Sequence, residues 1–209
     1  MLFYLAPMEG ITGYIVRNAY AHYFPYIDKY FTPFIPAAKK MSKKIKRDLA
    51  AENNEQIRLV PQLIGNRADE FLMMIRQLED LGFTSVNLNF GCPSGTVVSK
   101  RKGAGFLADP KELEMLLEEV LEKSPLAVSV KTRVGIKDPD EWEALCGVYV
   151  KFPLEELIIH PRLQNDYYSG TPRMETFARA LEQIHVPLCY NGDICSCLLY
   201  TSDAADDKA

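Results

Sequence analysis

Short runs of branched and aromatic residues alternate along the chain with longer segments in which apolar residues recur at helical spacing. This alternation is typical of repeated βα units around a parallel sheet. Two of the longer segments also carry helix boundaries, since residues 68–82 end on Gly82 and residues 109–124 open on Asp109 followed by Pro110. The short runs predict seven strands, over residues 3–7, 29–35, 58–65, 85–90, 127–134, 156–162 and 186–193.

Two α/β folds fit this alternation, a (β/α)8 barrel of the TIM type and an open doubly wound sheet. An open sheet that binds a dinucleotide would carry GxGxxG after its first strand, whereas the first strand here runs into "APMEGITG". We therefore predict an incomplete TIM-type barrel with about seven of the eight βα units, forming a catalytic domain over residues 1–196.

The segment 197–209, "CLLYTSDAADDKA", has neither a strand pattern nor a helix cap. Its first part resembles the translation, in one frame, of a transposase-type adapter used in sequencing libraries. We therefore expect this segment to be a non-native tail that interrupts the barrel before its eighth strand. The alternative is a natural disordered terminus.

Composition narrows the class of protein. A chain of 209 residues with 47% hydrophobic and 25% charged residues is typical of a soluble globular domain. No apolar run approaches the roughly 18 residues of a membrane span, and the N-terminus lacks the basic start of a signal peptide. The five cysteines form no CxxC pair, which suits a reducing compartment and disfavours structural zinc. We expect a cytoplasmic monomer without a membrane or metal partner.

Two basic clusters stand out against a formal net charge of −4: "KKMSKKIKR" at residues 39–47 and "SKRK" at residues 99–102. Each is consistent with a solvated helix face or loop, or with a surface that meets phosphates.

Polar side chains gather at the ends of the expected strands, and in a barrel these ends share the face that holds the active site. Cys92 lies in "GCP", on a turn that leaves a strand. Its thiol could be a nucleophile with His160 as base, a proton donor with a pKa near the usual value of about 8.5, or a small packing residue. The residues alone leave these roles open.

Three other strand ends suggest an anionic, planar cofactor. Lys131 offers a cation, Gln62 an amide that both donates and accepts, and the "NGD" of residues 191–193 offers backbone N–H groups for a phosphate. Taken singly, Lys131 could form a salt bridge in the core, Gln62 could cap a strand, and residues 191–193 could be a simple turn. Together they favour flavin mononucleotide (FMN), which has a hydrogen-bonding ring edge and one phosphate.

The chain resembles the tRNA-dihydrouridine synthase family. The motifs that carry the resemblance, over residues 1–196, are "LAPMEGIT", "PQLIG", "VNLNFGCP", "GAGFL", "VKTRVG", "HPRLQNDYYSG" and "YNGDI". The resemblance implies a barrel enzyme that uses FMN, with NADPH as reductant, to reduce uridine in tRNA to 5,6-dihydrouridine, with Cys92 as proton donor. It implies FMN contacts from Pro7, Met8, Gln62, Lys131, His160, Asn191, Gly192 and Asp193. It also implies substrate contacts from Asn89, Arg133, Arg162 and Tyr168.

Some residues depart from the family pattern. Gly95 and Thr96 replace a Pro-Lys pair, the "SKRK" loop is longer, and Pro161 stands where a small residue is usual. The family's phosphate-binding loop after an eighth strand and its C-terminal helical domain are not found in the sequence. Two alternatives therefore remain, an inert fragment of such an enzyme and a flavin enzyme acting on free pyrimidines, similar to dihydroorotate dehydrogenases.

Overall fold

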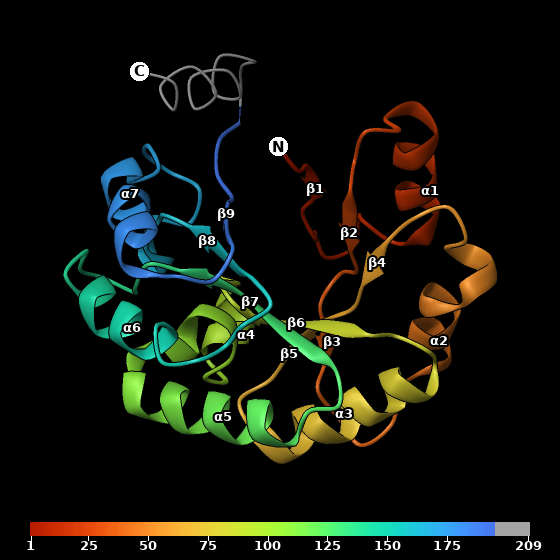
Figure 1. Cartoon of the computed structure of the whole chain (residues 1–209), viewed down its shortest axis with the longest axis horizontal. Helices are drawn as coiled ribbons and strands as arrows, with labels where there is room; N and C mark the ends of the chain where they lie inside the picture. The colour runs from red at the N-terminus through yellow and green to blue at the C-terminus, as the bar shows by residue number, and fades with distance from the viewer. Residues whose placement is uncertain (195–209) are drawn as a thin grey trace.

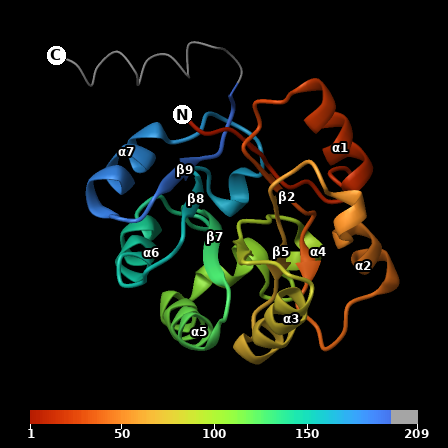
Figure 2. The ribbon, with the colours of Figure 1, turned by 45° about the vertical axis from the view of Figure 1, so that its right-hand side comes forward.

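The computed structural model describes residues 1–194. Its strands form a curved wall, and helices α3, α5, α6 and α7 lie along the outside of the curve (Figures 1 and 2). The strands are β1 Tyr4–Leu5, β2 Lys29–Phe31, β3 Ile35–Pro36, β4 Leu59–Val60, β5 Gln62–Ile64, β6 Ser85–Phe90, β7 Ala127–Arg133, β8 Leu157–His160 and β9 Leu188–Tyr190. The helices are α1 Tyr14–Tyr23, α2 Lys43–Leu49, α3 Ala68–Asp80, α4 Gly95–Val98, α5 Pro110–Lys123, α6 Glu141–Tyr149 and α7 Met174–Gln183.

All seven expected strand segments form strands, and every pairing between them is parallel. Two segments are split, into β2 with β3 and β4 with β5, and each split contains a proline, Pro33 or Pro61. Proline has no N–H to give to a strand ladder, so each of these segments contributes its first half to one sheet and its second half to the other. The two sheets, β1-β2-β4 and β3-β5-β6-β7-β8-β9, are thus joined through these two segments and follow chain order. This confirms an incomplete β/α barrel, in which β1 and β9 are the outer strands of the described residues.

Alternation along the strands separates two cores. On β6, Val86, Leu88 and Phe90 face the outer helices and belong to the larger hydrophobic cluster. A smaller cluster of Phe31, Val60 and Ile158 joins strands from opposite parts of the wall, with Tyr4 and Cys189 packed against it. This smaller cluster is the interior of the barrel.

A buried ion pair crosses the interior. The Lys29 ammonium lies 3.1 Å from a carboxylate oxygen of Glu156, and the Tyr4 hydroxyl donates to the other oxygen at 2.6 Å. The Lys29 ammonium also lies 4.6 Å from the centre of the Tyr4 ring. These contacts tie β1 and β2 to the start of β8, so the first strands are held at a fixed place opposite the later ones.

The helix boundaries expected from the sequence are confirmed. Helix α3 ends just before Gly82, whose φ is +86°. Asp109 caps α5, because its carboxylate accepts from the amides of Lys111 and Glu112 at 3.1 Å each. The segment 197–209 lies outside the described residues. Within residues 1–194, the helices are too short or too polar to cross a membrane.

Candidate active site

A cavity of about 240 Å³ opens at the carboxyl ends of the strands. Its walls come from the segment after β1, from β5, β6, β7 and β8, from the turn after β6 and from the loop after β8. Nine of the expected site residues line it: Pro7, Met8, Gln62, Asn89, Cys92, Lys131, Arg133, His160 and Tyr168. Side chains scattered over some 160 positions of sequence are therefore brought to one place by the ends of parallel strands.

A chain of hydrogen-bonded side chains starts from the two amides that line the cavity, Gln62 and Asn89. Gln62 donates to Asn87 at 2.7 Å, Asn89 donates to Gln62 at 2.8 Å, and Asn87 donates to Ser129 at 2.9 Å. The Asn89 side-chain oxygen accepts from the backbone amides of Gly91 and Cys92, at 3.0 Å each. Asn89 thus fixes the turn that carries the Cys92 thiol, and the amide chain fixes Asn89.

The Cys92 thiol is held in its protonated form. Burial is the main cause that raises its pKa, and Glu9 adds to this, while the nearby cations Arg133 and Lys131 oppose it. The raised pKa means that the thiol keeps its proton at neutral pH. The same cations would stabilise a thiolate once the proton had left.

Lys131 and His160 respond to the same environment. Burial, assisted by Arg133, lowers the pKa of Lys131 to about 8, so its ammonium is still mostly charged at neutral pH. Burial, followed by the charges of Lys131, Arg133 and Arg162, lowers the pKa of His160 to about 3. The imidazole is therefore neutral. Within residues 1–194, neither Lys131 nor Arg133 forms an ion pair with a carboxylate, so the cavity is positively charged and suits an anionic ligand.

Arg133 holds one wall of the cavity. Its side chain is 2% exposed and donates to three backbone carbonyls: Gly91 at 3.0 Å, Leu163 at 2.7 Å and Tyr167 at 2.7 Å. Tyr167 has a φ of 51°, a conformation that non-glycine residues seldom adopt. The next ring, Tyr168, lies 5.4 Å from the Arg133 guanidinium. Arg133 therefore joins the turn after β6 to the loop that presents Tyr168 to the cavity.

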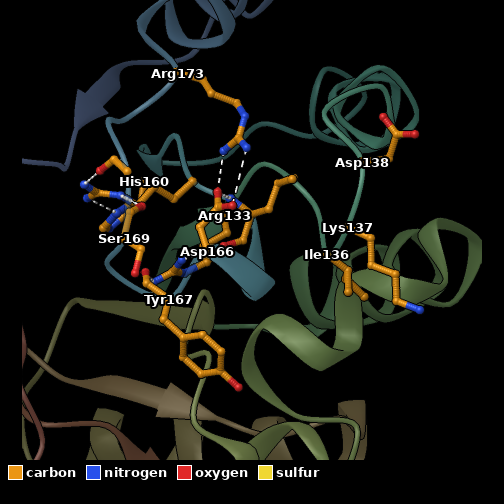
Figure 3. Close-up of polar contacts among 12 residues, drawn as sticks. Arg133, Ile136, Lys137, Asp138, His160, Asp166, Tyr167, Ser169 and Arg173 are labelled. Carbon is orange, nitrogen blue, oxygen red and sulfur yellow. Dashed lines mark hydrogen bonds and ion pairs between the residues drawn. The ribbon is translucent and has the colours of Figure 1, made fainter.

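The same loop is braced from its outer side (Figure 3). Arg173 pairs with Asp166, whose carboxylate also accepts from the amide of Leu163 at 2.8 Å. Arg162 donates to the carbonyls of Ser169 and Gly170. The loop after β8 is thus fixed by three arginines: Arg133 and Arg162 bind its backbone carbonyls, and Arg173 binds the Asp166 carboxylate.

Four expected site residues do not line the cavity: Asn191, Gly192, Asp193 and Arg162. They form a second group beside it, at the ends of β8 and β9. Arg162 donates to both carboxylate oxygens of Asp193, at 2.7 and 2.6 Å, and also to Nε2 of His160 at 3.3 Å. The Asn191 side chain lies close enough to His160 to raise the pKa of its imidazole, against the larger lowering effect of burial. This group reaches the cavity through His160.

Four further residues line the cavity that were not predicted as site residues: Glu9, Phe34, Gly91 and Pro93. Gly91 and Pro93 flank Cys92, and Glu9 follows Met8, so their neighbours in sequence were a usable signal. Asn87 and Ser129 were also missed, although each occupies an inward position on a strand whose next inward residue was assigned. Within the described part of the chain, no group of three His, Cys, Asp or Glu side chains could hold a metal ion.

The fold and the site define an α/β protein with a positively charged cavity and a protonated thiol at the strand ends. Residues 4–205 match the family model described as "Dihydrouridine synthase (Dus)". The chain belongs to the dihydrouridine synthase family.

Curated relatives agree with this family. A "Probable tRNA-dihydrouridine synthase" of Staphylococcus epidermidis is 30% identical over 168 residues, which cover 78% of this chain and 51% of that protein. The "tRNA-dihydrouridine(16) synthase" of Pseudomonas putida is 30% identical over 199 residues, covering 91% of this chain and 61% of the relative. The "tRNA-dihydrouridine synthase B" of Pasteurella multocida is 26% identical, with 92% and 58% covered. The chain therefore spans about half to three fifths of the length of these relatives.

Proposed function

We propose that this chain carries the FMN site and the proton donor of an enzyme that reduces uridine in tRNA to 5,6-dihydrouridine. The observation that carries the proposal is the joint presence of a protonated thiol, a half-buried ammonium and two amides around one cavity, in a chain of the dihydrouridine synthase family. The relatives named above are described as acting on tRNA.

The residues present fit an anionic flavin. Lys131 supplies a cation with no carboxylate partner among the described residues, and Gln62 supplies an amide beside it. We assign Pro7, Met8, Gln62, Lys131 and His160 to the ring and its ribityl chain, and Asn191, Gly192 and Asp193 to the phosphate side. When bound, FMN supplies a hydride to the uracil ring, after its own reduction by NADPH.

Saturation of the C5–C6 bond of uracil also requires one proton, which the chain itself supplies. Cys92 gives its thiol proton to C5 as the new C–H bond forms, and the negative charge moves to sulfur. Arg133 and Lys131 stabilise that charge. The raised pKa of Cys92 keeps the proton available at neutral pH, and His160, whose pKa is lowered to about 3, is too weak a base to remove it. A nucleophilic role would need the opposite condition, a lowered thiol pKa with a base beside it.

The uridine must leave its stack to enter the cavity. We assign Asn89, Arg133, Arg162 and Tyr168 to its recognition. The Tyr168 side chain is 71% exposed at the cavity and offers a ring for stacking. Arg133 and Arg162 act through the loop that they hold in place.

The test is to purify the chain and measure flavin absorbance, then incubate it with NADPH and unmodified tRNA and detect dihydrouridine by mass spectrometry of the nucleosides. The proposal predicts bound FMN and a gain of two hydrogens on uridine. A colourless protein, or one that reduces free pyrimidines but not tRNA, would contradict it.

A further inference from the structure

The segment from Lys39 to Arg47, which we call the basic segment, carries a concentration of charge that the proposed active site does not use. Its six cations are all exposed: Lys39, Lys40, Lys43, Lys44, Lys46 and Arg47. The segment contains no Asp or Glu, although the chain as a whole has a formal net charge of −4.

These charges are not neutralised by neighbours. Other exposed cations pair with carboxylates, such as Lys123 with Glu119, Lys151 with Glu114 and Arg179 with Glu143. Within residues 1–194, none of the six cations of the basic segment forms an ion pair. Asp48, the nearest acidic residue in sequence, is already engaged by Arg17 and by the amide of Tyr14. The basic segment therefore presents a net positive surface.

Both ends of the basic segment are anchored to the walls of the cavity. Before it, Phe34 lines the cavity, and the amide of Ala37 donates to the carbonyl of Ile64 at the end of β5. After it, Arg17 bonds to the Asp48 carboxylate at 3.0 Å and to the Thr12 carbonyl at 2.8 Å. Thr12 in turn bonds to the backbone of Met8, which lines the cavity. The basic segment is thus linked through these contacts to two segments that line the cavity, those of Phe34 and Met8.

The chemistry of the segment indicates its partner. Its apolar residues point into the protein, since Met41 belongs to the main core and Ile45 packs against it. A helix that binds a lipid surface would present an apolar face outward, and α2 presents lysines instead. A row of unpaired cations without an apolar face suits a chain of phosphates.

We propose that the basic segment is the surface on which the phosphate backbone of RNA lies while a uridine occupies the cavity. This inference rests on the proposed function. The other basic cluster, around Lys100, is less suited, because Arg101 within it is paired with Glu112.

The experiment compares three variants with the unaltered chain. One replaces Lys43, Lys44 and Lys46 with Gln, and a control replaces with Gln three cations on or next to the outer helices, Lys123, Lys151 and Arg179. A third, with Arg at positions 43, 44 and 46, keeps the charge. Affinity for tRNA is measured by fluorescence anisotropy as a function of salt, and flavin content and circular dichroism report on folding.

We expect the first variant to bind tRNA at least about tenfold more weakly at about 50 mM salt, with a log–log salt slope reduced by about two to three. The control and the arginine variant should bind nearly as the unaltered chain does, and all should retain equal flavin. Equal affinity in the Gln and control variants, or no tRNA binding by the unaltered chain, would overturn the inference. The inference would also be overturned if the Gln variant lost binding to phosphatidylserine vesicles but kept its affinity for tRNA. If the unaltered chain and all variants lack flavin or form no dihydrouridine while their tRNA affinities differ as expected, the proposed function is wrong, but the basic segment is still an RNA-binding surface.

Discussion

The backbone of Gly103 lies against Cys92, so that a Cβ at Gly103 would be 2.7 Å from the Cys92 carbonyl oxygen. The same carbonyl accepts from the amide of Ala104 at 3.0 Å, and Gly103 has a φ of +54°. The position of the thiol therefore depends on a residue without a side chain eleven positions later.

Gly103→Ala should displace the turn that carries Cys92. The methyl group would meet backbone, which cannot rotate away, and the positive φ adds strain, so we expect a loss of about 2 kcal/mol in unfolding free energy. Urea unfolding measures this, and dihydrouridine formation should fall with it. Gly95→Ala is the matched control, because a Cβ there meets nothing within 4 Å. Equal behaviour of the two variants would contradict the proposed packing.

Arg133→Lys should loosen the loop after β8. A lysine cannot reach the carbonyls of Gly91, Leu163 and Tyr167 together, because the three bonds use the fork of the guanidinium. Hydrogen bonds from charged groups contribute about 1.5 to 3 kcal/mol each, so we expect a loss of about 2 to 4 kcal/mol and faster proteolysis within 163–170.

Arg76→Lys serves as the control for that change, since Arg76 is exposed on α3. It should alter the unfolding free energy by less than about 0.5 kcal/mol. If Arg133→Lys were equally silent, the three carbonyl contacts would not be what orders the loop.

Flavin affinity should depend on pH through Lys131. Its pKa of about 8 means that the free protein loses the ammonium charge as pH rises through that value, so FMN affinity should be constant below pH 8 and weaken above it. Lys131→Met should bind FMN weakly at every pH and melt at a higher temperature than the unaltered apoprotein at neutral pH, since a partly desolvated charge is removed. Titration of flavin fluorescence checks the first point. A pH-independent affinity in the unaltered chain would exclude Lys131 as the cation that matters.

Much of the fold was predictable, because strand periodicity and helix caps are local signals. The segments at residues 85–90 and 109–124 show this most directly. The splits between β2 and β3 and between β4 and β5 were not predicted, although Pro33 and Pro61 can be read from the sequence. A proline interrupts a strand ladder only where a neighbouring strand would accept a hydrogen bond from that residue, and this depends on how the strands pair. Phe34 was missed for a similar reason, since an irregular segment has no period to read, whereas Glu9 could have been found from its position beside Met8.

The division of the site into two groups also required the structure. The sequence placed Arg162 and Asp193 at strand ends but could not show that they bind each other. Likewise, the choice between a nucleophilic and a protonated Cys92 depends on burial and on charges from β7 and from the segment after β1. These are long-range properties of the folded chain.

The central claim is that Cys92 gives the proton to the uracil ring. The most direct measurement compares Cys92→Ala with the unaltered protein for flavin content, for flavin reduction by NADPH, and for dihydrouridine formed in tRNA. We predict unchanged flavin content and unchanged flavin reduction, with dihydrouridine formation lowered by about 10²- to 10⁴-fold, the usual effect of removing a positioned general acid. Loss of the flavin, or near-normal reduction of uridine, would contradict the claim and leave Cys92 as a packing residue.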